Sequence, residues 1–254
     1  MNGGETLTKC RERGKHRLMA SWHTEEIDIE GVESFLVRPA DPTGAAVLFL
    51  HWFDEAPNAN RSQFLDEAGA LAELGVTSLL PQLTFPWLSP PTDMENDLRR
   101  IQEEIRRLER ACELLAVSSG GGPSRLVVVG HDFGAMHGMG LLDKIDLVGA
   151  VLIAPTARWA DWFLRFWPIG SDRWDYMRSL HPVDPIVTVA AARCPLLFQF
   201  GNADFYIAPM TGLEMFQAAP EPKELETYDS GHDMALEQVR LDRTAFIERV
   251  LAFE

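Results

Sequence analysis

Cysteine is scarce in this chain. Among 254 residues only Cys10, Cys112 and Cys194 occur, far apart in the sequence and odd in number. No two of them have the Cys-x-x-Cys spacing of zinc sites and redox motifs. The pattern argues against a disulfide framework and predicts a reducing, cytoplasmic compartment. The seven histidines show no metal-ligand spacing either, so we expect a site without a metal ion or other cofactor.

Positive charge is also in short supply. Lys and Arg total 23 against 38 Asp and Glu, which gives a formal net charge of −15. This balance argues against nucleic acids and anionic membranes as partners, because both repel an acidic surface. No apolar run approaches the length of a membrane-spanning helix. Residues 1–22 are locally basic but lack the apolar stretch of a signal peptide, so we interpret them as a loosely attached arm.

The remainder, 23–254, has the composition of one α/β domain, with 46% hydrophobic and 24% charged residues. The clearest helix is predicted over 94–116, where apolar residues recur at intervals of three and four. Alternation of strands and helices predicts a mostly parallel sheet with helices on both faces. We expect strands over 25–29, 34–38, 45–51, 76–80, 126–129, 149–154, 195–200 and 223–228, and further helices over 62–74, 135–144 and 234–252.

A Gly-x-Asp-x-Gly turn carries the strongest functional signal. The apolar strand Leu126–Val129 leads into Gly130-His131-Asp132-Phe133-Gly134, and a helical stretch follows. A sharp strand-to-helix turn strains the backbone of its apex residue, and flanking glycines avoid the clash that a Cβ would cause. The turn would hold the Asp132 carboxylate at the C-terminal edge of the sheet, beside a helix N-terminus that favours negative charge.

This turn resembles the nucleophile elbow of the α/β-hydrolase superfamily. Its Gly-His-Asp-x-Gly form is similar to the aspartate-nucleophile branch, which includes epoxide hydrolases and the haloalkane and haloacid dehalogenases. Two later segments fit the order nucleophile, acid, histidine of that superfamily. Gly201-Asn202-Ala203-Asp204 follows one strand, and Asp229-Ser230-Gly231-His232 follows the next. The resemblance implies that Asp204 orients His232 and that His232 is the general base.

The loop after the strand 45–51 matches a further part of the superfamily pattern. It reads His51-Trp52-Phe53, where members of the superfamily usually have a His-Gly start. The resemblance implies that this loop and Phe133 supply the backbone N–H groups of an oxyanion hole. We therefore expect the hole to form from Phe133, Trp52 and Phe53, with His51 beside the substrate. Trp52, in place of glycine, is expected to alter the loop and narrow the site.

The segment 156–193 lies where such enzymes carry a lid, and it is short and rich in aromatic residues. Trp159 and Trp162 have the spacing of a helix that docks on the body of the domain. They are equally suited to roofing an apolar substrate pocket. Tyr176 and His181 are the lid groups able to donate a proton. A lid this compact resembles the dienelactone-hydrolase-like branch rather than the large-lid enzymes.

The chemistry of a carboxylate nucleophile narrows the reactions. Attack by Asp132 on an ester gives a high-energy anhydride, whereas attack on a saturated carbon gives an alkyl ester that His232-activated water can hydrolyse. We therefore expect an epoxide hydrolase acting on a small to medium apolar substrate, with Tyr176 or His181 as the acid. Dehalogenation is the alternative, with Trp52 or a lid tryptophan as the halide donor.

Two other interpretations stay open. In the first, water is the nucleophile, and Asp132 acts as the general base of an ester hydrolase, lactone hydrolase or lyase. The chain could instead be a non-catalytic ligand-binding protein, although all three positions of the expected triad are filled. A small molecule is the expected partner, and a homodimer is left open.

Overall fold

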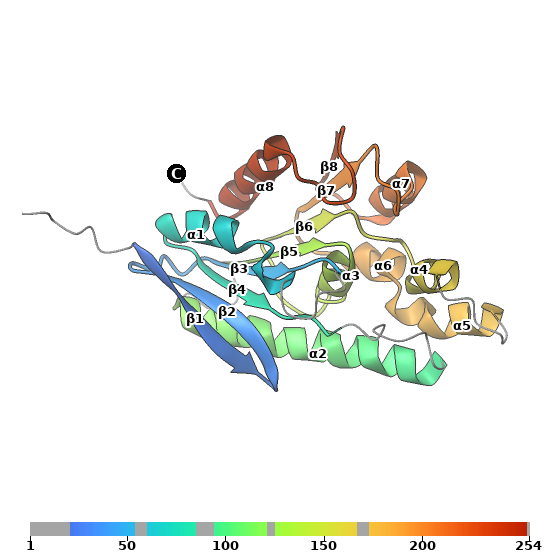
Figure 1. The fold of residues 1–254 in the computed structure, drawn as a ribbon, viewed down its shortest axis with the longest axis horizontal. Coiled ribbons are helices and arrows are strands. Elements are labelled where there is room, and N and C mark those ends of the chain that lie inside the picture. The colour runs from blue at the N-terminus through green and yellow to red at the C-terminus, as the bar shows by residue number, and fades with distance from the viewer. Residues whose placement is uncertain (1–20, 54–59, 85–93, 121–124, 167–172, 253–254) are drawn as a thin grey trace, which may run out of the picture.

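A computed structural model describes residues 21–53, 60–84, 94–120, 125–166 and 173–252 (Figure 1). Eight strands form one sheet in the order β1-β2-β4-β3-β5-β6-β7-β8. The first two strands form an antiparallel hairpin, β2 pairs antiparallel with β4, and all remaining pairs are parallel. The strands are β1 (Trp22–Ile29), β2 (Val32–Pro39), β3 (Ala46–Leu50), β4 (Thr77–Pro81), β5 (Leu126–His131), β6 (Gly149–Ile153), β7 (Leu196–Gly201) and β8 (Lys223–Tyr228).

Burial on both faces explains the composition of the central strands. Every residue of β3, β4, β5, β6 and β7 is buried, and these strands are largely apolar on both faces rather than alternating, with Thr77, Ser78, His131 and Gln199 as the polar exceptions. Figure 1 shows α1 (Leu65–Glu73) and α8 (Glu237–Val250) on one face of the sheet and α2 (Met94–Ser119) on the other. The predicted, mostly parallel sheet between two helical layers is confirmed.

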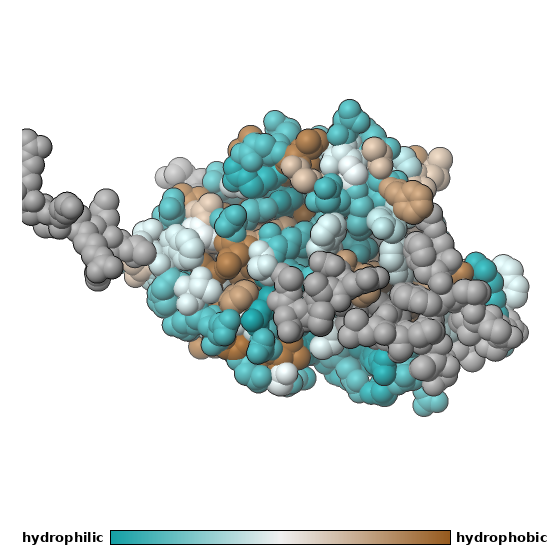
Figure 2. Space-filling model, viewed as in Figure 1, coloured by the Kyte–Doolittle hydropathy of each residue, from teal (hydrophilic) through white to brown (hydrophobic). Residues whose placement is uncertain are grey.

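The predicted hairpin is present, and its turn has a local cause. Glu30 and Gly31 both have positive φ angles, 54° and 83°, as the tight turns that best join twisted antiparallel strands require. On the face shown in Figure 2 hydrophilic side chains predominate and apolar ones are scattered, as the acidic composition suggests. The predicted arm 1–22 lies almost wholly outside the described residues.

Helix ends depart from the sequence prediction where local backbone preferences intervene. The segment predicted as one helix over 62–74 begins as a 3-10 turn, η1 (Asn60–Ser62), and becomes α-helical only at Leu65. Helix α3 (Phe133–Met139) ends five residues before the predicted 144, since Gly138 and Gly140 lower helix propensity there. Helix α8 begins after the predicted residue 234, because Met234 has a left-handed φ of 51°.

The lid segment contains the helix that the spacing of its tryptophans predicts, α4 (Trp159–Phe166). After it come α5 (Arg173–Leu180), η3 (His181–Val183), α6 (Pro185–Thr188) and η4 (Val189–Ala191). Helix α7 (Pro209–Ala218) was missed by the sequence analysis. Pro209 at its first position was the available signal, since proline favours that place in a helix. None of the described helices is both long and apolar enough to cross a membrane.

Close contact between α3 and β3 generates a stability prediction. A Cβ on Gly134 would lie 2.1 Å from the carbonyl oxygen of Leu50, a backbone atom that cannot move aside. We expect Gly134→Ala to lower the free energy of unfolding by about 3 kcal/mol or more, seen as a lower Tm in thermal unfolding. Gly138→Ala in the same helix is the control, because its nearest atoms, at 3.0 and 3.4 Å, belong to the side chains of Val128 and Leu50. Equal Tm values for the two variants would contradict this account.

Candidate active site

Asp132 lies at the apex of the turn from β5 into α3. Its backbone is strained, with φ 53° and ψ −118°, a conformation that costs a non-glycine residue about 1–3 kcal/mol. Two backbone hydrogen bonds hold it there: Asp132 N–H donates to Ile153 O at 2.8 Å, and Met136 N–H donates to Asp132 O at 3.0 Å. A Cβ on Gly130 would lie 2.5 Å from Ala135 Cα. The flanking glycines are therefore required by close backbone approach, as the sequence pattern indicates.

The structure brings the three predicted triad residues together at one edge of the sheet. Asp132 follows β5, Asp204 follows β7 and His232 follows β8, and the C-terminal ends of parallel strands share an edge. His232 Nδ1 lies 2.7 Å from Asp204 Oδ2, and His232 Nε2 lies 3.8 Å from Asp132 Oδ2. The imidazole thus lies between two carboxylates that are almost fully buried.

Asp204 is held by its own loop. Its Oδ1 accepts hydrogen bonds from the backbone N–H groups of Tyr206 at 2.7 Å and Ile207 at 3.0 Å, which leaves Oδ2 facing His232. One carboxylate oxygen therefore fixes the loop while the other orients the imidazole. This arrangement gives His232 a proton on Nδ1 and directs Nε2 toward Asp132.

The electrostatics of the site favour a charged imidazole. Burial disfavours the imidazolium, but the hydrogen bond to Asp204 and the negative charges of Asp132 and Asp204 outweigh it and raise the pKa of His232 to about 9. At neutral pH His232 is therefore protonated on both nitrogens. In that state it can donate a proton from Nε2, and it can accept one there only after the proton has left.

The predicted oxyanion hole needs one correction. Phe53 N–H points toward Asp132 Oδ2 at 3.4 Å, as an oxyanion donor should. The Trp52 N–H instead donates to Gln63 Oε1 at 2.9 Å and is directed away from the carboxylate. Phe133 directly follows Asp132 as the first residue of α3, where backbone N–H groups point out of the helix end. The candidate hole therefore comprises Phe53 and Phe133, without Trp52.

His51 was predicted beside the substrate, and the structure gives it a different role. Its Nδ1 donates to Trp52 O at 2.7 Å, and its Nε2 accepts from Leu83 N–H at 2.8 Å. Burial lowers its pKa to about 4, so the ring is neutral and its two nitrogens serve the loop. His51 therefore stabilises the turn after β3 from a buried position, because each of its ring nitrogens already makes a hydrogen bond with the backbone.

The two predicted lid tryptophans differ in position. Trp159 is fully buried, and its indole N–H donates to Val183 O at 2.9 Å, so it docks α4 on the body. The Trp162 ring meets Phe133 edge to face at 5.3 Å between centroids and lies 5.6 Å from Tyr206. Trp159 also stacks on Phe133, at 6.0 Å between ring centroids, so both tryptophans belong to the aromatic group next to the elbow, and Trp159 docks α4 as well.

The two predicted proton donors are not placed for that role. The Tyr176 hydroxyl is buried between α5 and α2 and donates to Asp97 Oδ2 at 3.0 Å, and burial together with the Asp97 charge raises its pKa. The His181 side chain is 66% exposed, with its Nδ1 3.5 Å from Asp184 Oδ2. The epoxide prediction therefore loses the acid on which it depended.

A pocket beside the three predicted triad residues was not predicted from the sequence. Tyr206 stands edge-on to the His232 ring at 5.1 Å and forms one wall of a cavity of about 260 Å³. Its position two residues after Asp204 was the available signal. The cavity also contains a carboxylate, Asp161, whose pKa burial raises. It is lined by Thr156, Asp161, Trp162, Tyr206, Ile207, Ala208 and Thr211.

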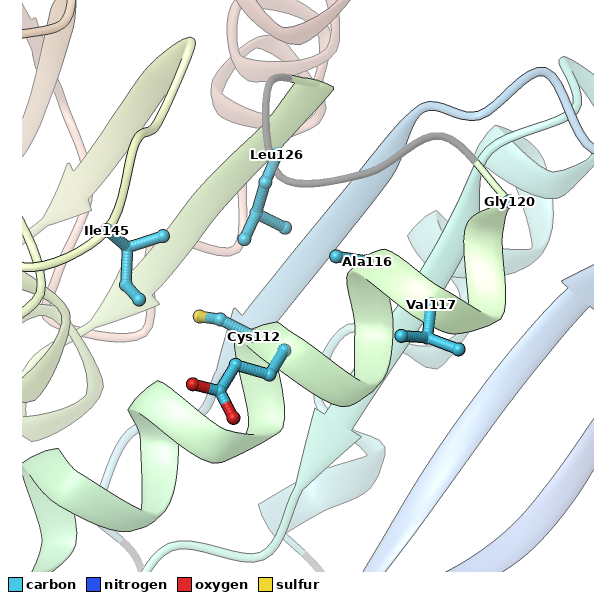
Figure 3. A pocket seen from close by; sticks show the side chains of 7 residues that line it. Cys112, Ala116, Val117, Gly120, Leu126 and Ile145 are labelled. Atoms are coloured by element: carbon cyan, nitrogen blue, oxygen red, sulfur yellow. The ribbon is translucent and has the colours of Figure 1, made fainter.

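A larger cavity, of about 490 Å³, lies away from this chemistry (Figure 3). Its walls come from the C-terminal part of α2 and the start of β5, at the opposite end of the strand from Asp132. Burial raises the pKa of Cys112, the thiol in its wall, to about 12, which leaves it unreactive. Among the described residues no group of three or more His, Cys, Asp and Glu side chains is arranged to hold a metal ion.

Solved structures with the same architecture are numerous. TT1662 from Thermus thermophilus superposes with a TM-score of 0.69 at 19% identity, covering 92% of this chain and 99% of that one. An acetyl xylan esterase from Paenibacillus sp. R4 gives 0.68 at 15% identity, covering 91% and 89%. A Klebsiella pneumoniae protein assigned to the dienelactone hydrolases gives 0.64 at 17% identity, covering 92% and 99%.

The chain has the α/β-hydrolase fold. This confirms the predicted fold class. Because the sequence identities are below 20%, the likeness to these structures shows the fold alone. No protein-family model matches the sequence, and no curated protein does. The esterase names among the neighbours give no support to the predicted epoxide-hydrolase branch, and the aspartate nucleophile stays a prediction.

The raised pKa of His232 generates a prediction for stability against pH. A group whose pKa is raised by folding stabilises the folded state fully below its ordinary value of 6.5. That contribution, on the order of 3 kcal/mol, is lost as the pH rises through about 9. We expect Tm to fall between pH 7 and 10, and less steeply in Asp132→Asn, which lacks one of the charges. His181→Gln changes an exposed histidine and is the control, so its Tm should depend on pH as that of the wild type does. If the Tm of Asp132→Asn falls with pH as steeply as that of the wild type, Asp132 does not help to raise the pKa of His232.

Proposed function

We propose that this protein is a hydrolase that cleaves an activated ester or lactone, with Asp132 as nucleophile, His232 as acid and then base, and Asp204 orienting His232. The observation that carries the proposal is the His232 imidazole between two carboxylates, 3.8 Å from Asp132 and 2.7 Å from Asp204. A serine nucleophile needs a neutral histidine to remove its proton. A carboxylate needs no deprotonation, so a protonated histidine is the correct starting state.

In the first half-reaction Asp132 Oδ2 attacks the carbonyl carbon of the substrate. The carbonyl oxygen becomes an oxyanion stabilised by the N–H groups of Phe53 and Phe133. When the tetrahedral intermediate collapses, the bond to the leaving oxygen breaks and His232 gives its Nε2 proton to that oxygen. The products of this step are an alcohol and a mixed anhydride on Asp132.

In the second half-reaction the histidine works as a base. Acylation removes the negative charge of Asp132, and the proton of His232 has already left with the alcohol. Neutral His232 then takes a proton from water, and the hydroxide attacks the anhydride. Cleavage releases the carboxylic acid and restores the Asp132 carboxylate and the His232 imidazolium, so one water is consumed for one ester.

The energy of the anhydride restricts the substrate. An ordinary alkoxide is a poor leaving group, and its expulsion by a carboxylate is strongly uphill. Phenol and enol leaving groups are far more acidic and reduce that barrier. Aryl esters, enol esters and enol lactones are therefore the substrate class that this nucleophile suits. The names of two neighbours, an acetyl xylan esterase and an assigned dienelactone hydrolase, support ester and lactone substrates.

A carbon–halogen bond is the second candidate, and the carboxylate at the elbow is the observation that favours it. Attack by Asp132 on a saturated carbon gives an alkyl ester, which the same hole and histidine would hydrolyse. Halide departure requires no proton, so the loss of Tyr176 as an acid does not count against this reaction. Opening of an epoxide by the same attack needs an acid on the face of the carbon opposite Asp132, and neither Tyr176 nor His181 is placed to supply it, so we do not favour an epoxide.

The pocket beside the triad supplies a charge preference. Asp161 lines it, and Arg158, whose guanidinium lies 3.6 Å from Asp161, is also paired with Glu214. Neither Arg158 nor Glu214 lines the cavity, and Asp161 is the only charged side chain among the lining residues, so the pocket wall itself carries a negative charge. With three hydroxyl-bearing residues, Thr156, Tyr206 and Thr211, the pocket suits a neutral, hydroxyl-bearing group of the substrate and disfavours an anionic one.

Covalent catalysis predicts a trapped intermediate. His232→Gln should retain attack on an aryl ester whose phenolate leaves without a proton, but should lose roughly 10²–10⁴-fold in turnover. We expect a burst of one phenolate per protein and an acyl mass on the peptide that contains Asp132. Asp132→Asn combined with His232→Gln is the control and should give no burst.

Two other outcomes of this experiment would change the proposed function. If an organohalide leaves an alkyl group on Asp132 and no aryl ester gives a burst, the protein cleaves carbon–halogen bonds, as the second candidate function states. Slow, steady ester turnover by His232→Gln without any acyl-protein would show that Asp132 is a base for water and would overturn the covalent proposal.

The charge of the pocket predicts a change in selectivity. Asp161→Asn should raise kcat/KM for an aryl ester with a carboxylate on the phenol, relative to its neutral methyl-ester counterpart, by roughly 10-fold. Asp175→Asn is a matched control, because Asp175 has the same 47% side-chain exposure and also pairs with an arginine three residues away. An unchanged ratio in Asp161→Asn would remove Asp161 from the substrate pocket.

A further inference from the structure

We propose that Gln63 and His131 are positioning residues that fix the oxyanion loop and the His232 loop relative to each other through one continuous chain of hydrogen bonds. Three contacts form this chain. Trp52 N–H donates to Gln63 Oε1 at 2.9 Å, Gln63 Nε2 lies 2.7 Å from His131 Nδ1, and His131 Nε2 lies 2.8 Å from the backbone oxygen of His232. Neither side chain belongs to the triad.

The direction of the chain follows from its first member. A backbone N–H can only donate, so the Gln63 amide must present its oxygen to Trp52 and its NH₂ group to His131. His131 Nδ1 must then accept, which places the ring proton on Nε2. The backbone oxygen of His232 can only accept, and the His131 Nε2–H satisfies it. Each link therefore dictates the next, and a single tautomer of His131 fits.

Burial keeps the His131 ring neutral, and the hydrogen-bond partners then select this tautomer. His131 is only 1% exposed, and burial, together with the nearby His232 charge, lowers its pKa well below the ordinary range. A second proton on Nδ1 would face the Gln63 NH₂ group and leave two donors in contact. His131 is thus a neutral connector, although its neighbour His232 is charged.

The chain joins loops that the sheet itself does not hold together. Trp52 follows β3, His131 ends β5, and His232 follows β8, which β6 and β7 separate from β5 (Figure 1). Binding the Trp52 N–H turns it away from the site, and the next N–H, that of Phe53, points at Asp132. Holding the His232 backbone sets where its imidazole stands relative to the same carboxylate.

The side chain of Trp52 completes the arrangement. Its indole stacks on His131 at 5.3 Å and on His232 at 6.1 Å between ring centroids, with interplanar angles of 25° and 20°. An aromatic face beside an imidazolium is favourable, and the ring covers both imidazoles. This contact gives a reason for tryptophan where the superfamily pattern usually has glycine.

The test compares three variants of the full-length protein. Gln63→Leu keeps the approximate size of the side chain and removes both hydrogen bonds. Gln63→Glu keeps the acceptor for Trp52 but has no proton for His131 Nδ1. Gln238→Leu is the matched control, because the Gln238 amide bonds Asp242 on the exposed side of α8. The ¹⁵N NMR signals of the histidine side chains report the His131 tautomer without any substrate, and kcat and KM are measured with an aryl ester.

In the wild type we expect His131 to be neutral with its proton on Nε2 from pH 6 to 9. Gln63→Glu should place a proton on Nδ1, which the ¹⁵N signal shows directly. Gln63→Leu should lower kcat by roughly 10–100-fold through misplaced loops, with KM within about twofold, while Gln238→Leu matches the wild type. If Gln63→Leu fails to fold, the isosteric Gln63→Glu carries the same test.

The inference rests on the proposed function for its kinetic measurement only, and the two can fail separately. Absence of ester hydrolysis in the wild type would overturn the proposed substrate class while the tautomer measurement still decides the hydrogen-bond chain. A wild-type His131 protonated on Nδ1, or wild-type kcat and KM in Gln63→Leu, would overturn the positioning role.

Discussion

The site depends on the charge interaction that holds the His232 imidazole between Asp132 and Asp204. A buried charge is unfavourable unless it is paired, and here each carboxylate offsets the burial of the imidazolium. The sheet makes the pairing possible, because loops after three parallel strands converge at one edge. The strained backbone of Asp132 and the glycines around it keep the first carboxylate at that edge. Removal of one charge therefore alters the protonation of the whole site.

Much of the fold, and the positions of the three site residues, could be predicted from the sequence because the patterns that indicate them are local. A buried strand, a Gly-x-Asp-x-Gly turn and two loops in a fixed order place Asp132, Asp204 and His232 without knowledge of any long-range contact. The same locality explains the apolar runs of the central strands and the hairpin turn at Glu30 and Gly31.

Predictions failed where a side chain's role is decided by a distant partner. Tyr176 was expected in the lid as an acid, but its hydroxyl bonds Asp97, which lies 79 residues earlier on α2. His51 was expected beside the substrate, yet it bonds the backbone of Leu83, 32 residues later. Gln63 has no motif around it and acquires its place only when β3, β5 and β8 are assembled. Periodicity and spacing carry no information about such pairs.

The proposed aspartate nucleophile and the α/β-hydrolase architecture are compatible for an electrostatic reason. In the second half-reaction an acyl or alkyl group on the nucleophile is attacked by water, and this step needs the same hole, histidine and acid whichever nucleophile carries the group. The first half-reaction differs in the protonation that it requires of the histidine. A serine contributes no charge and leaves the histidine neutral enough to act as base, whereas Asp132 adds a second negative charge that helps raise the pKa of His232 to about 9. In the proposed mechanism the carboxylate thus sets the protonation state that its own attack needs, and acylation removes the charge when the histidine must become a base.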